Sequence, residues 1–144
     1  MRPWLRGFVA DHEGWWRTAR GLPAQLGAMD EQSEWDDLLA PGEAKLADVL
    51  LGDTGEPVGI IMAALRPDRH LGVPTVVIQW IAVAPSARGR GLSARLLDHA
   101  LRWGAARGAL SAEVFVTAAN AAAVRAYERA DFTTSDLRMI RPLA

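Results

Sequence analysis

The chain has 144 residues, 50% of them hydrophobic, and its 16 Lys and Arg nearly balance its 17 Asp and Glu. This composition is typical of a single globular domain, residues 1–144, and a net charge of −1 argues against a nucleic-acid-binding surface. The absence of cysteine excludes disulfides, a thiol nucleophile and a cysteine-ligated metal. Because the opening "MRPWLRGFVADHEGWW" holds no long apolar run, we expect no signal peptide, no membrane span and a cytoplasmic protein.

The N-terminal part of the chain favours one strand and two helices. Residues 3–9, "PWLRGFV", are typical of a short strand, and residues 11–39 are helical in pattern with breaks at Gly21 and Pro23. The sequence "SEWD" at residues 33–36 has the form of a capping box, which predicts the start of a second short helix.

Strands follow in the middle of the chain. Lys45–Leu51 and Val58–Leu65 are apolar runs on either side of the turn sequence "GDTGEP", and together they predict a hairpin. Thr75–Val83, "TVVIQWIAV", is a β-branched run with one polar residue, so we expect a strand buried on both faces that ends before Pro85.

The hydrophobic period changes to that of a helix after Gly91. Apolar residues fall on one side of this helix and polar ones on the other, namely Ser93, Arg95, Asp98, His99 and Arg102, and Gly104 and Gly108 mark its fraying end. A strand is predicted at residues 110–116, a helix capped by Asn120 at residues 120–130, and one or two final strands within "FTTSDLRMI", residues 132–140. This order predicts a mixed α/β (α+β) layer with covered central strands.

The loop "RGRG", Arg88–Gly91, stands between the buried strand and that helix. A helix N-terminus has unpaired N–H groups and the positive end of the helix dipole, glycines let an anion approach the backbone, and arginines add forked donors. The same letters also fit a plain turn with solvated arginines. They lack the Lys-Ser/Thr end of a P-loop, and no Gly-x-Gly-x-x-Gly dinucleotide fingerprint is present.

The stretch "IAVAPSARGRGLSARLLDHAL" resembles motif A of the GNAT superfamily, the Gcn5-related N-acetyltransferases. That motif reads Arg/Gln-x-x-Gly-x-Gly/Ala between a strand and a helix. Arg88 and Gly91 stand at its fixed positions, and Ser93, which is still small, replaces the last Gly or Ala.

A second stretch, "NAAAVRAYERADF", resembles motif B of the same family. Asn120, Ala123, Tyr127 and Phe132 match the pattern, and Asp131 replaces its glycine. That position usually needs the left-handed backbone conformation, which Asp tolerates better than most residues.

The resemblance implies a GNAT fold of the α/β (α+β) class, with a mixed, mostly antiparallel central sheet of six to seven strands flanked by about four helices. It implies acetyl-CoA as cofactor, with the arm beside the backbone of Ile81, Ala82 and Val83. Asn120 is a further expected cofactor contact. The pyrophosphate is expected on the loop residues Arg88, Gly89, Arg90, Gly91, Leu92 and Ser93.

The implied reaction is direct attack of a primary amine on the thioester, with Tyr127 as the general acid for the departing thiolate. Several relatives carry a glutamate five residues before the motif B asparagine, where this chain has Phe115. Glu113, on the same face of the strand, could act as a base through water or could sit at a solvated strand end. His70 in a turn and His99 on a polar helix face are expected at the surface.

The resemblance leaves the acceptor amine open between a small molecule and a protein. The N-terminal tryptophans and acids fit a rim that attracts a cationic amine, and they fit equally well helices that pack tryptophans and expose charges. We expect no nucleic-acid or membrane partner and a possible homodimer. The alternative functions are a non-catalytic CoA-binding regulatory module and, against the charge balance, a nucleic-acid binder.

Overall fold

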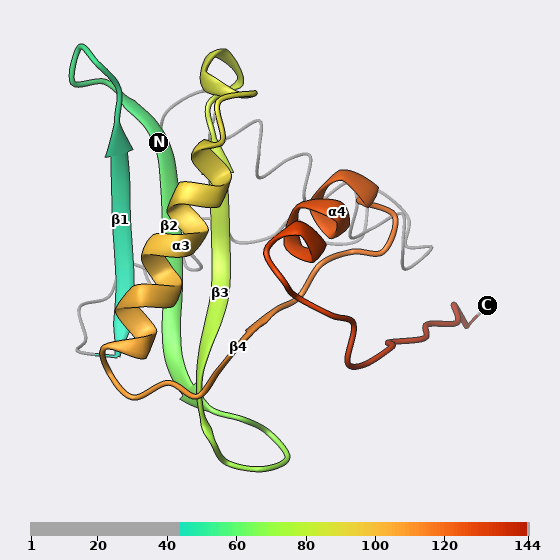
Figure 1. Ribbon diagram of the computed structural model, residues 1–144. Coiled ribbons are helices and arrows are strands. Elements are labelled where there is room, and N and C mark those ends of the chain that lie inside the picture. Colours follow the sequence, from blue (N-terminus) through green and yellow to red (C-terminus); the bar gives the residue numbers. More distant parts are fainter. Residues whose placement is uncertain (1–43, 144) are drawn as a thin grey trace. The chain divides into compact units, whose positions relative to one another are not determined.

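The computed structural model describes residues 44–143, and the strand and helices predicted before them lie outside the described residues (Figure 1). The described residues belong to two compact units, which divide between Phe115 and Val116. The labels of Figure 1 are kept, so the first described helix is α3.

Four strands form one sheet in the first unit. These are β1 (Lys45–Leu51), β2 (Pro57–Pro67), β3 (Pro74–Val83) and β4 (Ser111–Val114), in the order β1-β2-β3-β4. The first three are antiparallel neighbours, and β4 runs parallel to β3. This pairing confirms the predicted hairpin and the predicted third strand. Each strand is an apolar run flanked by turn residues, as the sequence pattern indicated. The β4 strand is shorter than the predicted residues 110–116.

Helix α3 (Leu92–Ala105) connects β3 to β4 and packs on the sheet, as Figure 1 shows. A short 3₁₀ helix, η1 (Pro85–Ala87), precedes it, with the predicted break at Pro85. The helix buries Leu96, Leu97, Ala100 and Gly104, while the predicted polar side is exposed. Burying a leucine side chain stabilises a fold by about 1.5–3 kcal/mol, so these contacts hold α3 in place. Gly104 is a packed helical residue and not part of a fraying end.

The pairing along β3 changes near its middle. Met62 of β2 lies opposite Trp80, but the next residue, Ala63, lies opposite Ile78, so Gln79 is an extra residue in β3. This is a β-bulge, which bends a strand and disrupts its ladder. On the other side, the pairing of β3 with β4 runs from Thr75 only as far as Ile78. The two parallel strands therefore part at the bulge, since their last pair is Ile78 with Val114. Figure 1 shows β4 diverging from β3.

The second unit contains helix α4 (Ala121–Arg129). Asn120 caps it as predicted, since its side-chain oxygen accepts a hydrogen bond from the Ala123 amide at 3.3 Å. The final strands predicted at residues 132–140 are absent: residues 132–143 form neither helix nor strand. β-Propensity needs a neighbouring strand to pair with, and none of the described strands pairs with these residues.

The described residues thus hold four strands and two α-helices, against six to seven strands and about four helices expected for the whole chain. Within residues 44–143, neither of the two α-helices, α3 and α4, is long and apolar enough to cross a membrane.

Candidate cofactor and active site

The loop Arg88–Ser93 leaves its backbone open on the outer side. Gly89 and Gly91 have left-handed φ angles of 79° and 70°, which side chains other than glycine rarely adopt. A Cβ placed on either glycine would meet no heavy atom within 4 Å. A bulky group can therefore approach the backbone at both positions.

The amides at the start of α3 are available to an acceptor. The first helical hydrogen bond runs from the Arg95 amide to the Gly91 carbonyl oxygen at 3.2 Å, so the amides of Leu92, Ser93 and Ala94 have no partner within the helix. No side chain caps this end, and its first turn carries no acid. The helix dipole adds a partial positive charge, and the loop thus fits an anion such as a pyrophosphate.

The two loop arginines differ in what they contact. The Arg88 side chain donates from Nε to the Val83 carbonyl oxygen at 3.4 Å, which ties the loop to the end of β3. Arg90 is exposed and makes no hydrogen bond or ion pair with any residue of 44–143. Arg90 therefore stays free to meet a ligand, while part of the Arg88 guanidinium holds the backbone.

The carboxyl-terminal half of β3 has an open edge. No described strand pairs with β3 beyond Ile78 on the side of β4. The Ala84 amide donates to the Val58 carbonyl oxygen at 2.8 Å, and antiparallel pairs bond alternately, so Ala82 faces β2 as well. Ile81 and Val83 therefore turn their N–H and C=O groups toward the open edge. Such an edge can accept an extended chain of amides as if it were another strand.

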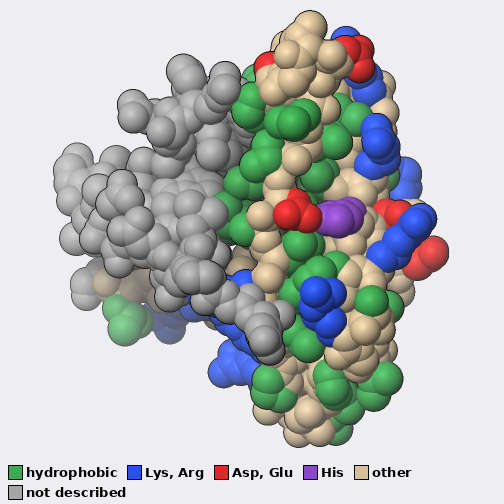
Figure 2. Space-filling view, turned by 90° about the vertical axis from the view of Figure 1, so that its left-hand side faces the viewer, with side chains coloured by type: hydrophobic (Ala, Val, Ile, Leu, Met, Phe, Trp, Pro, Cys, Tyr) green, Lys and Arg blue, Asp and Glu red, His purple; other side chains and the backbone are tan. Residues whose placement is uncertain are grey.

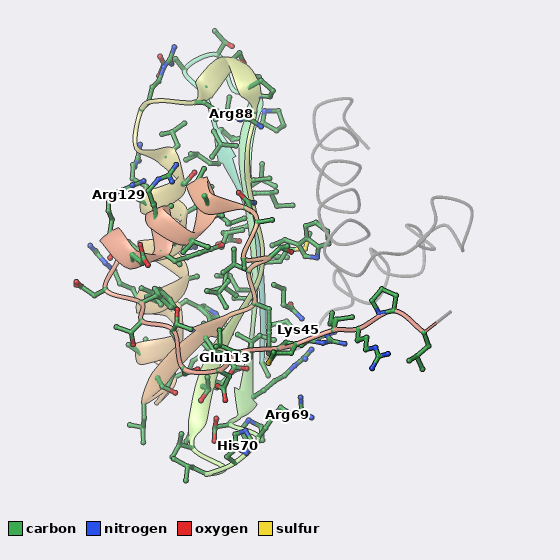
Figure 3. All side chains as sticks on the ribbon, turned by 90° about the vertical axis from the view of Figure 1, so that its right-hand side faces the viewer. Lys45, Arg69, His70, Arg88, Glu113 and Arg129 are labelled. Carbon is green, nitrogen blue, oxygen red and sulfur yellow. The ribbon has the colours of Figure 1, made fainter. Side chains whose placement is uncertain are left out.

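Glu113 lies in β4 opposite Val77, one rung before β3 and β4 part. Its side chain is half-buried and has no hydrogen bond or ion pair with any described residue. Phe115 follows the strand and is 76% exposed. Figure 3 places Glu113 along the sheet, away from the end that carries Arg88.

Neither of the described histidines lies at the loop. His70 is exposed in the turn between β2 and β3, at the opposite end of the sheet from Arg88 (Figure 3). His99, on the outer side of α3, contacts the Asp48 carboxylate, with Nε2 2.6 Å from Oδ2. The face seen in Figure 2 mixes acidic, basic and apolar side chains without a large patch of one sign. Both histidines are surface residues, as expected.

Tyr127 belongs to the end of α4 and is fixed there by a Schellman motif. The Phe132 amide donates to the Tyr127 carbonyl oxygen at 3.0 Å, and the Asp131 amide donates to the Glu128 carbonyl oxygen at 3.1 Å. Asp131 has a φ of 66°, so it adopts the left-handed conformation predicted for it. The rings of Tyr127 and Phe132 meet edge to face at 5.7 Å, which is the apolar contact that accompanies this motif.

Burial raises the pKa of the Tyr127 hydroxyl above its ordinary value, because a phenolate would lose its hydration. The hydroxyl is therefore protonated at neutral pH and can donate a proton or a hydrogen bond. Asn120 stands at the other end of α4. Its side-chain oxygen accepts the capping hydrogen bond, and its NH₂ group remains available as a donor.

The β-bulge at Gln79 was not predicted from the sequence. The residue is conspicuous in the sequence as the single polar side chain between Val76 and Val83. Its extra place in the ladder depends on the register between β2 and β3, which no local pattern reveals.

Comparison with known proteins places these features in a family. A family model described as the acetyltransferase (GNAT) family matches residues 10–132. The chain is 34% identical over 121 residues to L-2,4-diaminobutyric acid acetyltransferase of Streptomyces anulatus, and the match covers 83% of this chain and 65% of that relative. The chain therefore spans just under two thirds of the length of this curated relative.

Solved structures have the same fold. A putative acetyl transferase from Pyrococcus furiosus aligns with a TM-score of 0.71 at 25% identity, covering 95% of both chains. The aminoglycoside acetyltransferase AAC(6')-Iy, in complex with the bisubstrate analogue CoA-S-monomethyl-acetylneamine, aligns with a TM-score of 0.68 at 21% identity, covering 93% of this chain and 92% of that one.

Proposed function

The chain belongs to the acetyltransferase (GNAT) family, and from that premise we propose that it transfers the acetyl group of acetyl-CoA to a primary amine. The observation that carries the proposal is the pairing of an uncapped, open helix N-terminus with an open strand edge beside it. One element suits the pyrophosphate and the other suits the amide groups of the cofactor arm. The name of the curated relative suggests a small diamino acid as the first acceptor to test.

Cofactor binding in this proposal uses mainly backbone groups. The amides of Leu92 and Ser93, with Gly89 and Gly91 leaving room and Arg90 adding charge, hold the pyrophosphate. Ile81 binds the arm through its outward N–H and C=O groups and Val83 through its outward N–H, because the Val83 carbonyl oxygen already accepts from Arg88. Ala82 bonds to β2 and makes no contact with the arm. Asn120 donates from its free NH₂ group. Few side chains therefore take part in cofactor binding, so the site depends mainly on the backbone.

Acetyl-CoA, when bound, supplies an activated acyl group and a thiolate leaving group. Tyr127 donates its hydroxyl proton to the departing sulfur. Its raised pKa keeps that proton in place at neutral pH until it is needed. Since Tyr127 is the only tyrosine of the chain, no second phenol can replace it.

The acceptor must lose a proton before it attacks, because an alkyl amine with a pKa of about 10.4 is mostly protonated at pH 7. Glu113 takes this proton through a bound water in our proposal. Its carboxylate has no partner among the described residues, and it lies one rung before the point where β3 and β4 part.

A non-catalytic CoA-binding module is the second candidate, and Phe115 favours it. An exposed phenylalanine stands where several relatives have a glutamate, so the chain has no base at that position. A regulatory protein would bind the cofactor through the same loop and strand edge without turnover.

The experiment has two steps, a calorimetric titration with acetyl-CoA and an amine screen that follows thiol release. We expect binding, and turnover with L-2,4-diaminobutyrate or another small amine. Binding without turnover on any amine would support the regulatory module. No binding and no thermal shift with millimolar acetyl-CoA would refute both candidates.

A further inference from the structure

Arg88 is held against the end of β3 by a bond from the middle of its side chain. The donor is Nε, 3.4 Å from the Val83 carbonyl oxygen, and not one of the two terminal nitrogens of the guanidinium. The backbone turns at the same place, since the Ala87 amide of η1 donates to the Ala84 carbonyl oxygen at 2.9 Å. Side chain and backbone together fix where the loop Arg88–Ser93 begins, at the end of the sheet where Figure 3 labels Arg88.

The same bond marks one end of the strand edge described above. The Val83 carbonyl oxygen points away from β2, because the next amide, that of Ala84, donates to Val58 of β2. The Nε–H group of Arg88 meets this outward oxygen. An extended ligand that follows the edge therefore reaches the Arg88 side chain at Val83, and it passes there from the strand to the loop.

Arg90 differs from Arg88 in this respect. Both side chains are exposed, and the two residues are separated only by Gly89. Among residues 44–143, the bond to the strand is made by Arg88 and not by Arg90. The two arginines of the loop are therefore suited to different tasks, one to holding the loop and the other to adding charge.

We infer that Arg88 is a positioning residue, and that its Nε–H donor rather than its charge is the feature that matters. It fixes the loop at the end of the strand edge, so that the anionic part and the amide part of one ligand fit at the same time. This inference rests on the proposed function and names the residue that holds its two binding elements together. A loop that is ordered before binding loses less conformational freedom when the ligand arrives, which strengthens binding.

Glutamine separates the donor from the charge. Its amide nitrogen is the same number of bonds from Cα as the Nε of arginine, so Arg88→Gln can keep a donor beside the Val83 carbonyl oxygen while the charge is lost. Arg88→Met has a side chain of similar length and loses both. Arg90→Gln and Arg90→Met are the matched controls, because that side chain does not bond to the strand.

Calorimetry with acetyl-CoA gives the first measurement. We expect Arg88→Met to bind about 3- to 10-fold more weakly than Arg88→Gln, the range that one hydrogen bond provides. Arg90→Met and Arg90→Gln should bind alike, since both lack the charge. The ratio at position 88 compares two neutral side chains, so added salt should leave it unchanged.

Hydrogen exchange of the ligand-free protein gives a second measurement that needs no cofactor. The Ala87 amide belongs to the turn that Arg88 holds, and its exchange rate reports how often that turn opens. We expect this amide to exchange about 3- to 10-fold faster in Arg88→Met than in Arg88→Gln, again the range of one hydrogen bond. The Arg90 variants should exchange at the wild-type rate.

The outcomes separate this inference from the function on which it rests. Equal affinities of Arg88→Gln and Arg88→Met would overturn it, and so would a Met-to-Gln ratio at position 90 as large as that at position 88. A lower melting temperature of Arg88→Met with an unchanged affinity ratio would make the bond purely structural and would also overturn it. If the wild-type protein does not bind acetyl-CoA, the proposed function fails, and the exchange of the Ala87 amide still decides whether Arg88 positions the loop. Arg88→Leu, which also lacks a donor, replaces Arg88→Met if that variant does not fold.

Discussion

Gly104 of α3 packs directly on the side chain of Val76 in β3, so closely that a Cβ at Gly104 would overlap the Val76 Cγ2 atom. Alanine is the better helix former by about 1 kcal/mol, yet we expect Gly104→Ala to lower the free energy of unfolding by about 1–3 kcal/mol. The reason is overpacking between helix and sheet. Urea unfolding of the variant measures this cost.

A double-mutant cycle with Val76→Ala tests the contact, because this substitution removes the Cγ2 atom that a Cβ at Gly104 would overlap. Gly104→Ala should cost much less in that background, with a coupling energy of about 0.5–3 kcal/mol. Equal costs in both backgrounds would contradict the contact.

Gly91, in the loop Arg88–Ser93, and Gly72 provide a test variant and its matched control. Both have a φ of 70° and open space where a Cβ would stand, but Gly72 lies in the turn between β2 and β3. Alanine at either position should cost about 1–2 kcal/mol of stability through the left-handed backbone. Only Gly91→Ala should also weaken acetyl-CoA binding, by about tenfold or ~1.4 kcal/mol, since its methyl group stands where the pyrophosphate approaches. Calorimetry on both variants would contradict this prediction if their affinities agreed.

Asp131 holds a glycine-like conformation at the end of α4, with φ at 66°. Asp131→Gly should raise the free energy of unfolding by about 0.5–1 kcal/mol, because glycine adopts this conformation without steric cost. Asp131→Val should lower it, since a β-branched residue is a clear outlier there. Thermal melts of the two variants should therefore move in opposite directions. A shift of the same sign in both would mean that backbone strain does not control this site.

Elements with a strong local signal were predictable from the sequence. The apolar stripe of α3, the hairpin of β1 and β2, and the Asn120 cap follow from spacing and side-chain chemistry alone. The left-handed Asp131 followed from its place in a family motif. Residues 132–140 were mispredicted as strand because their composition favours β structure while the ladder depends on a partner elsewhere in the chain.

The site, like the fold, was predictable where local sequence determines the structure and not where distant segments must pair. The loop Arg88–Ser93 could be found from its glycines and from the helix that follows it. The bulge at Gln79 and the bond from Arg88 to Val83 depend on how strands align and how the chain folds back. The roles of Tyr127 and Glu113 remain proposals.

The pKa of Tyr127 can be measured directly because the chain has no other tyrosine. Burial disfavours the phenolate, so the folded protein should titrate above the ordinary value of about 10, and the denatured chain should titrate near it. The unfolded chain then loses its proton first. The stability that the neutral hydroxyl contributes is fully present below about pH 10 and is lost as pH rises through the folded pKa. Tyrosinate absorbance measured with and without denaturant tests this order, and coincident curves would contradict it.

Tyr127→Phe separates catalysis from binding. The change removes the hydroxyl and keeps the ring, so the contact with Phe132 should survive and acetyl-CoA affinity should stay nearly unchanged. Loss of a positioned general acid typically lowers the rate by about 10²- to 10⁴-fold. Steady-state kinetics with an acceptor from the amine screen, beside an acetyl-CoA titration, should place the whole loss in kcat.

The control for this variant is Phe132→Leu, which weakens the ring contact and leaves the hydroxyl in place. We expect it to lower the melting temperature while keeping most of the turnover, because the Phe132 amide still donates to the Tyr127 carbonyl oxygen. If Phe132→Leu lost as much turnover as Tyr127→Phe, the helix end and not the proton would control the rate. If Tyr127→Phe kept full turnover, a water beside the sulfur would supply the proton and Tyr127 would leave the mechanism. The fold and the cofactor loop would stand in either case, since neither depends on this hydroxyl.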